Sequence, residues 1–282
     1  MSPRAVLKIG GDLLSRPEAL SEVLRDVASL VAEGWRFVIC HGGGPQASDL
    51  QARLGMSTRK VGGRRITDAA TLQVMKQVLA GEVNVDLVAT ALAAGIDAIG
   101  LAGVSGGLVK ARRRPPIVVS GGGDAPIDFG YVGDVVGIRT GLIEHLWAGG
   151  WTPVLSTLGV DTEAEGPSAP VFNINADTVS AAIAGALRAD HLFAMTNVPG
   201  VLRDKDDLTT RIPRLTSSEA KRAIADGIIV GGMIPKIEEA LRNLARGIGA
   251  IHILGVGVGV LAEEAASPGS RGTVLVAGSA SA

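Results

Sequence analysis

A lysine followed by two glycines stands at the end of the first apolar run of the chain. Lys8 lies within the run 5–9, and Gly10 and Gly11 come directly after that run. Glycine lets the backbone approach an anion closely and point N–H groups at it, and a lysine ammonium is a mobile charge suited to phosphate. The segment is a candidate phosphate site, although a tight turn beside an exposed lysine explains it equally well.

A second glycine-rich turn, H-G-G-G-P at 41–45, joins the apolar run 36–40 to a helical pattern at 46–54. Glycines ahead of a helix N-terminus favour anion binding. The spacing matches neither the P-loop nor the dinucleotide fingerprint, and a packing turn is the alternative. Both turns would follow parallel strands, at whose carboxyl ends open α/β sheets bind ligands. The pattern therefore predicts an anion site that includes Gly43 and Gly44.

Polar residues stand at the start of three other predicted helices. Arg65 precedes one helix and has the planar fork that binds a carboxylate with two hydrogen bonds. Asn173 lies in an extended segment just before Asp177, which begins the next helix. A solvated arginine and a plain N-cap cluster are the respective alternatives. Lys236 lies in the first turn of a third helix, where a positive charge opposes the helix dipole unless an anion compensates it.

The elements that must position these residues alternate along the chain as short apolar runs and longer helical patterns. Continuous apolar strands joined through helices predict an α/β fold whose parallel sheet is covered on both faces. We expect strands at 5–9, 36–40, 98–101, 152–156, 191–195, 250–254 and 273–276, helices at 17–33, 46–54, 67–80, 83–93, 141–148, 176–187, 217–226 and 234–245, and a hairpin of 109–112 with 117–119. The softest boundary between domains lies near 161–175.

Composition excludes several classes of protein. The 282 residues are 46% hydrophobic and 20% charged, which is ordinary for a globular chain, and the net charge of −1 argues against a nucleic-acid partner. Cys40 is the single cysteine, so no internal disulfide can form, which is consistent with a cytoplasmic location. We see no signal peptide and no membrane span. The four histidines are scattered without metal-ligand spacing, so we expect no metal site built by the chain.

Eight segments, taken in this order, resemble the amino-acid kinase family, and within it the enzymes that phosphorylate N-acetyl-L-glutamate. The resemblance covers nearly the whole chain. The segments are 8–11 (KIGG), 41–45 (HGGGP), 65–68 (RITD), 79–84 (LAGEVN), 130–134 (GYVGD), 173–177 (NINAD), 196–201 (TNVPGV) and 231–236 (GGMIPK).

This resemblance implies a three-layer αβα sandwich around a mainly parallel sheet. Residues 1–175 would form an N-terminal lobe that binds the acyl amino acid and dimerises, and residues 176–282 a C-terminal lobe that binds ATP. The implied reaction moves the γ-phosphoryl group of ATP to the γ-carboxylate of N-acetyl-L-glutamate, giving N-acetylglutamyl 5-phosphate for arginine biosynthesis. Mg²⁺ would ride on the ATP phosphates. Arginine-inhibited members carry a helix before the first strand, so we expect here a homodimer that arginine inhibits poorly.

The family's motifs also assign roles to residues. Lys8 would contact the transferring phosphoryl group, Lys236 would stabilise it together with the leaving ADP, and Asp177 would orient both lysines. Arg65 and Asn173 would hold the α-carboxylate. The backbone donors to the phosphoryl group and the γ-carboxylate would be Gly11, Gly43 and Gly44, and the nucleotide would contact Gly10, Thr196, Asn197, Gly200, Val201, Gly231, Gly232 and Met233. Many relatives have an aspartate where this chain has Asn197, a departure that concerns the nucleotide contacts and not the reaction.

Other readings stay open. An aminoadipate-type or carrier-linked kinase of the same fold differs by a slightly deeper pocket, which one methylene discriminates weakly. A non-catalytic binding protein on the same scaffold would have no need of both Lys8 and Lys236. The glycine-rich stretch 113–128 is longer than a tight hairpin needs, and we expect it to act as a mobile lid over the acetyl group.

Overall fold

The computed structural model describes residues 2–119, 121–204, 206–231 and 233–278. Its centre is an eight-stranded sheet in the order β12-β14-β13-β11-β1-β2-β8-β5. Neighbouring strands are parallel except β13 and β14. The strands are β1 (Arg4–Ile9), β2 (Arg36–His41), β5 (Ala98–Ala102), β8 (Thr152–Ser156), β11 (His191–Met195), β12 (Arg214–Thr216), β13 (Ala250–Leu254) and β14 (Thr273–Val276). The mainly parallel sheet is thus confirmed.

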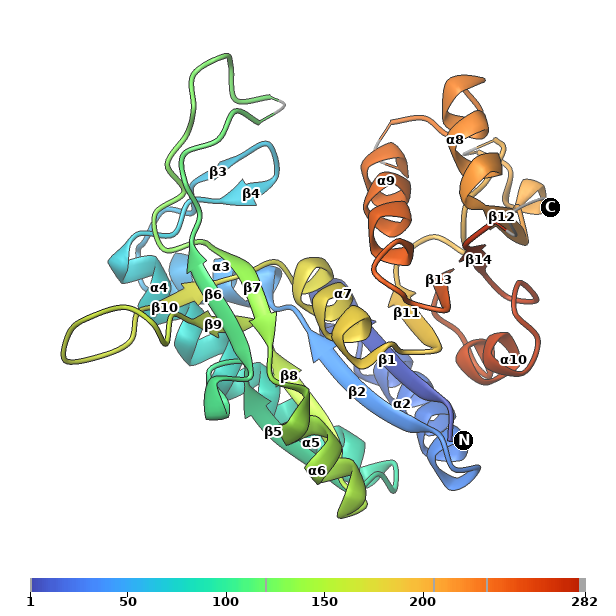
Figure 1. The fold of residues 1–282 in the computed structure, drawn as a ribbon, viewed down its shortest axis with the longest axis horizontal. Helices are drawn as coiled ribbons and strands as arrows, with labels where there is room; N and C mark the ends of the chain where they lie inside the picture. Colours follow the sequence, from blue (N-terminus) through green and yellow to red (C-terminus); the bar gives the residue numbers. More distant parts are fainter. Residues whose placement is uncertain (1, 120, 205, 232, 279–282) are drawn as a thin grey trace.

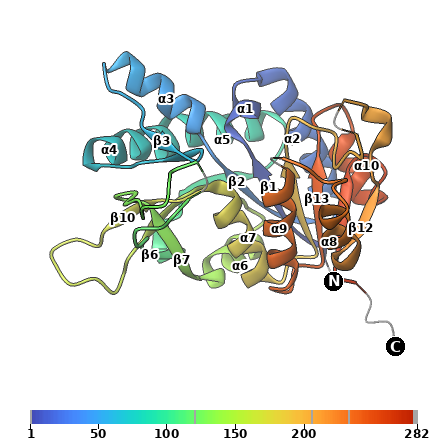
Figure 2. The ribbon, with the colours of Figure 1, turned by 90° about the horizontal axis from the view of Figure 1, so that it is seen from above.

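Helices cover both faces of this sheet, which gives the predicted three-layer αβα sandwich. Figure 2 shows α1, α2, α3, α5 and α10 on one side and α6, α7, α8 and α9 on the other. The helices are α1 (Gly11–Leu14), α2 (Pro17–Ala32), α3 (Gly44–Arg53), α4 (Ala69–Gln77), α5 (Val83–Ala93), α6 (Thr140–Ala148), α7 (Ala176–Leu187), α8 (Ser217–Ala225), α9 (Met233–Leu244) and α10 (Val260–Ala266), with short 3₁₀ turns η2 (Ser105–Gly107) and η3 (Leu208–Thr210). Among the described residues, no helix is long and apolar enough to cross a membrane.

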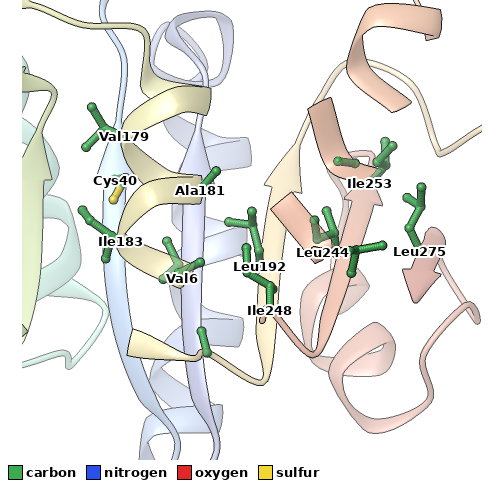
Figure 3. Close-up of a cluster of buried hydrophobic side chains, with 14 of the residues drawn as sticks. Val6, Cys40, Val179, Ala181, Ile183, Leu192, Leu244, Ile248, Ile253 and Leu275 are labelled. Atoms are coloured by element: carbon green, nitrogen blue, oxygen red, sulfur yellow. The ribbon is translucent and has the colours of Figure 1, made fainter. Parts of the chain in front are cut away.

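Each face of the sheet has its own hydrophobic core. Alternate residues of β1 point to opposite faces, so Val6 packs with α7 and α9 while Leu7 packs with α2 and α5. Figure 3 shows the first core, in which Val6 and Cys40 lie under Ile183 of α7. Burial raises the pKa of the Cys40 thiol, which keeps it protonated and unreactive.

A smaller sheet of β10 (Val171–Asn173), β9 (Leu158–Val160), β6 (Val109–Arg113) and β7 (Gly133–Ile138) lies beside the main one. The predicted hairpin of 109–112 with 117–119 is wrong, because β6 pairs antiparallel with β7 instead. Pro115 and Pro116 follow β6 and cannot donate to a ladder. Ile117 forms only an isolated bridge to Ile127.

The loop between β6 and β7 extends away from the sheets beside the hairpin of β3 (Lys60–Val61) and β4 (Arg64–Arg65), as Figure 1 shows. A small apolar cluster joins the two segments. Val119 and Phe129 of the loop are buried in it, and Val61 of the hairpin packs against them. The hairpin and the loop therefore form one projecting unit.

The helix expected at 67–80 is shorter in the structure, where α4 spans Ala69–Gln77. Helix α4 ends at Gln77, and a π-helical turn, η1 (Val78–Glu82), leads directly into α5. Such turns insert an extra residue and often occur at functional sites. Here the π-helical turn places the Leu79 side chain against Gly43. A Cβ atom added to Gly43 would lie only 2.6 Å from Leu79 Cδ2, so the position leaves no room for a side chain.

Candidate active site

A cavity of about 430 Å³ opens at the carboxyl ends of β1 and β2. It is the place where the topology of an open α/β sheet predicts a ligand site. The cavity brings together residues that the sequence keeps far apart. Those among its walls that were predicted are Lys8, Gly10, Gly11, Gly43, Gly44, Arg65, Asn173 and Asp177.

Lys8 and Asp177 form an ion pair at the wall of this cavity. The Lys8 Nζ atom lies 2.8 Å from Asp177 Oδ1, and the two side chains are 16% and 46% exposed. Asp177 is held in the first turn of α7, where its backbone N–H donates to the N-cap side chain of Asn175 at 2.9 Å. The pair fixes the lysine ammonium while leaving it open to an incoming anion.

The two glycine turns brace each other. The Gly42 N–H donates to Ile9 O at 3.0 Å, and Gln46 Nε2 donates to Gly11 O at 2.8 Å. Gly43 is the N-cap of α3 and provides no side-chain cap, so the first N–H groups of that helix are free to meet an anion at the cavity. Both turns therefore present backbone N–H groups at the cavity, and the anion site remains a prediction.

His41, the last residue of β2, supports the second glycine turn. The ring is fully buried, with Nδ1 2.8 Å from Gly42 O and Nε2 3.0 Å from Asn84 Nδ2. Asn84 also donates to Val154 O at 3.1 Å. Burial lowers the pKa of His41 to about 4, so the ring is neutral at pH 7, donating through Nδ1 and accepting at Nε2.

Arg65 is largely committed to protein acceptors. Its Nη2 donates to Gly44 O at 2.8 Å and to Ser48 Oγ at 2.7 Å, and its Nη1 donates to Gln51 Oε1 and to Thr58 Oγ1. The four Nη protons are thus used within the chain, and burial lowers the pKa of the guanidinium. Arg65 therefore holds the second glycine turn against β4.

Asn173 lies on β10 and lines the cavity. Its amide Nδ2 donates to Thr67 Oγ1 at 3.2 Å, and its backbone N–H donates to Tyr131 O at 2.9 Å. Residues 130–134, the GYVGD segment of the sequence, thereby run beside Asn173, and Val132 joins it in the cavity wall.

Lys236 comes to the site from α9 and lines a smaller cavity of about 100 Å³ together with Lys8, Asp177 and Thr196. Its Nζ donates to Thr196 Oγ1 at 3.4 Å, and among the described residues it has no ion pair with Asp177. The structure therefore brings both predicted lysines to one place but joins only Lys8 to the aspartate.

The other described residues predicted at the nucleotide lie outside the walls of these two cavities. Asn197 donates to Asp12 Oδ2 at 2.9 Å, which ties the segment 196–201 to the first glycine turn. Val201 is buried, and its N–H donates to Thr273 Oγ1, a side chain that also closely approaches Gly200. Gly231 and Met233 stand at the start of α9. Gly232 lies outside the described residues.

Comparison with known proteins gives the family. The model of the amino acid kinase family matches residues 3–255. The chain belongs to the amino acid kinase family. It is 52% identical to the acetylglutamate kinase of Anaeromyxobacter dehalogenans over 96% of this chain and 98% of that protein, and 49% identical to that of Sorangium cellulosum over 96% and 94%.

Solved structures agree on the fold. The crystal structure of smu.665 from Streptococcus mutans superposes on this amino acid kinase with a TM-score of 0.74 at 29% identity, covering 99% of this chain and all of that one. N-acetylglutamate synthase from Neisseria gonorrhoeae has a TM-score of 0.79 at 23% identity, covering 98% of this chain and 60% of that one.

Sequence reasoning missed a carboxylate of this amino acid kinase. Glu239 stands one turn after Lys236 on α9 and lines both cavities. Burial, together with the nearby charge of Asp177, raises its pKa. The sequence signal for Glu239 was its spacing from Lys236. Residues three apart share a face of a helix, so a side chain at 239 is expected on the same side as Lys236.

Proposed function

We propose that this chain transfers the γ-phosphoryl group of ATP to the γ-carboxylate of N-acetyl-L-glutamate. The product is N-acetylglutamyl 5-phosphate, an intermediate of arginine biosynthesis. The observation that carries the proposal is the meeting of Lys8, Asp177 and two glycine turns in one cavity, within a chain that is about half identical to proteins named acetylglutamate kinase.

The reaction makes few demands for acid–base chemistry. A γ-carboxylate with a free pKa of about 4.3 is ionised at pH 7 and attacks phosphorus without a general base. The enzyme must align the attacking oxygen with the γ-phosphorus and neutralise charge on the transferring group. The cavity offers lysine ammonium groups and backbone N–H donors, which suit that task.

Within this proposal, Lys8 binds the equatorial oxygens of the transferring phosphoryl group from the β1 side. Asp177 keeps the Lys8 ammonium in place through their ion pair. The backbone N–H groups of Gly11, Gly43 and Gly44 donate to the phosphoryl group and to the attacking carboxylate. Lys236, reaching in from α9, neutralises charge that accumulates on the leaving ADP oxygen.

ATP enters on the side of α9 and of the segment 196–201. Gly10, Asn197, Gly200, Val201, Gly231, Gly232 and Met233 contact the nucleotide in this proposal. Among the described residues, no group of three acidic, histidine or cysteine side chains is placed to hold a metal ion. The donor set of lysines and N–H groups suits phosphate oxygens, so Mg²⁺ would arrive on the ATP phosphates and offset their charge.

The acyl amino acid occupies the larger cavity. Asn173 would donate to its α-carboxylate with the amide that now donates to Thr67, and Arg65 would join it after releasing one of its present acceptors. The projecting loop within 113–128 and the β3–β4 hairpin form the lid over the acetyl group. Lys60 and Arg64 of the hairpin already line the cavity, so a small movement of the unit would cover the substrate.

We further propose a cytoplasmic homodimer whose lobes are residues 1–175 and 176–282. Strand β5 forms an edge of the main sheet, and the neighbouring α5 exposes Val85 and Leu92, at 62% and 51%, on one helical face. Light scattering should give twice the 28.7 kDa chain mass, and Leu92→Glu should give the single chain. A wild-type monomer would refute the dimer.

The test of function is hydroxamate formation from MgATP and hydroxylamine with a panel of acceptors. N-acetyl-L-glutamate should give hydroxamate and ADP in equal amounts, while glutamate and aspartate should give neither. Preferred turnover of N-acetyl-aminoadipate would move the proposal to a longer substrate. The absence of hydroxamate from every acceptor would contradict it and favour a carrier-bound substrate or a non-catalytic role.

A further inference from the structure

We propose that Arg114 is a substrate-binding residue that holds the α-carboxylate of the acyl amino acid and selects for it. This inference rests on the function proposed above. Arg114 follows β6 at the base of the projecting loop and lines the larger cavity together with Asn173 and Val132. It belongs to none of the segments on which the family resemblance was built.

The argument begins with the position of the two ends of the substrate. The γ-carboxylate must lie where Lys8 and the glycine turns can reach it, because phosphoryl transfer takes place there. The α-carboxylate then lies toward the other wall, which is formed by the β3–β4 hairpin, Arg114 and Val132. A dianionic substrate needs a cation at this second wall.

Arg65 offers little free capacity there, since its four Nη protons already go to protein acceptors. Besides Lys8 and Arg65, the cations that line the cavity are Lys60, Arg64, Arg114 and Arg242. Among them only Arg114 is partly buried, with a side chain that is 17% exposed. The three exposed side chains would lose far more conformational freedom on binding.

Arg114 is also held in one orientation. Its Nε lies 2.8 Å and its Nη2 2.7 Å from the same carboxylate oxygen, Asp134 Oδ1. Its backbone N–H donates to Val132 O at 2.9 Å, which places Arg114 and Asn173 beside the same segment of chain. Within the described residues, both protons of Nη1 are without an acceptor. A guanidinium fixed in this way has donors ready for a carboxylate.

The same contacts give a role to residues 130–134, the GYVGD segment, to which the proposed phosphoryl transfer assigned none. Asp134 orients the arginine, Val132 offers an apolar surface for the acetyl methyl group, and Tyr131 O fixes Asn173. Selectivity would follow, because an analogue without the α-carboxylate leaves the arginine donors unpaired.

The test compares two ligands and three proteins. The ligands are N-acetyl-L-glutamate and 4-acetamidobutanoate, which is the same molecule without the α-carboxylate. The proteins are wild type, Arg114→Ala and Arg112→Ala. Arg112 is a matched control, because it lies on β6 two residues before Arg114, pairs with Glu163 and stands outside the cavity. Calorimetry gives Kd, and turnover gives KM and kcat.

Arg114→Ala should weaken N-acetyl-L-glutamate by about 10- to 100-fold in Kd, the loss of a hydrogen bond to a charged group. It should leave the Kd of 4-acetamidobutanoate and the KM for ATP unchanged, and Arg114→Lys should recover part of the loss. Arg112→Ala should change none of these values. The KM for N-acetyl-L-glutamate should rise with little change in kcat, because the α-carboxylate is remote from the reacting oxygen.

Equal losses for both ligands would show that Arg114 only maintains the fold of the wall, and would overturn the inference. An unchanged Kd for N-acetyl-L-glutamate would overturn it too. Both outcomes leave the proposed function standing if wild type forms hydroxamate from N-acetyl-L-glutamate. A wild-type enzyme that neither binds nor phosphorylates this substrate would overturn the function and the inference together.

Discussion

Replacement of Lys8 by alanine separates a catalytic contribution from a structural one. The Lys8–Asp177 pair lies at the cavity wall, with an aspartate that is nearly half exposed. Ion pairs this open contribute about 0–1 kcal/mol to stability. In a chain of this size, 1 kcal/mol corresponds to a shift in Tm of about 2–4 °C. The fold should therefore tolerate the loss of the pair.

The effect on the rate should be much larger. A fixed donor that meets charge developing in the transition state contributes about 2.7–4 kcal/mol, or roughly 10²- to 10³-fold in kcat. Asp177→Asn should lower kcat less, because Lys8 keeps its charge and loses only its orientation. Lys221→Ala, which removes an exposed lysine on α8, is the control and should change neither kcat nor Tm.

The assay is ADP release under saturating MgATP and acceptor, with Tm measured on the same samples. A Lys8→Ala enzyme that is folded and keeps its kcat would refute the assignment. A variant that loses kcat only together with a large fall in Tm would show that the pair holds the structure instead. The prediction requires loss of rate without loss of fold.

Three further results are expected. Gly43→Ala should lower kcat/KM and destabilise the fold by about 1–3 kcal/mol through overpacking against Leu79, whereas Gly44→Ala, whose Cβ meets nothing within 4 Å, should cost little stability; equal losses would contradict this. Because burial lowers the pKa of His41 from 6.5 to about 4, the unfolded chain binds a proton first as pH falls, so the unfolding free energy should decline between pH 6.5 and 4. Because burial also lowers the pKa of His191 to about 4, the His41→Gln variant should show a smaller decline in urea titrations and not a flat profile. A decline equal to that of the wild type would show that His41 does not contribute to it. Substrate should slow proteolysis within 113–128, and equal cleavage rates would argue against a lid.

The regular part of the fold follows from local pattern. Largely apolar runs such as 5–9 and 191–195 identify strands whose two faces are both covered, because such strands carry few charged side chains, and Lys8 stands next to the end of its run. Gly34 ends α2 with φ of 93°, a conformation that glycine adopts without strain. These signals lie within a few residues of each other, so the sequence alone shows them.

The smaller sheet could not be read in the same way. Strand β6 pairs with β7 across some twenty residues of loop, and no local pattern states which segment will be its partner. The π-helical turn that places Leu79 beneath Gly43 is likewise a product of packing, because residues 67–93 read as ordinary helix.

In the candidate site, too, local pattern predicted some features, and long-range packing set the others. Glycine turns after strands predicted where the cavity lies, since topology alone sends the ends of parallel strands to one edge of the sheet. The partners of individual side chains did not follow. The guanidinium of Arg65 donates to Gln51, Ser48 and Gly44, and that of Arg114 donates to Asp134. These contacts join residues that are far apart in the sequence.

The central claim is that the γ-carboxylate oxygen of N-acetyl-L-glutamate attacks the γ-phosphorus of ATP. Substrate labelled with ¹⁸O in the γ-carboxylate, incubated with MgATP, enzyme and hydroxylamine, tests it directly. Hydroxylamine attacks the acyl carbon, so the bridging oxygen leaves with phosphate. The account predicts inorganic phosphate that carries one ¹⁸O atom, seen by ³¹P NMR, and unlabelled phosphate from substrate labelled only in the α-carboxylate. Unlabelled phosphate from the γ-labelled substrate would contradict the account.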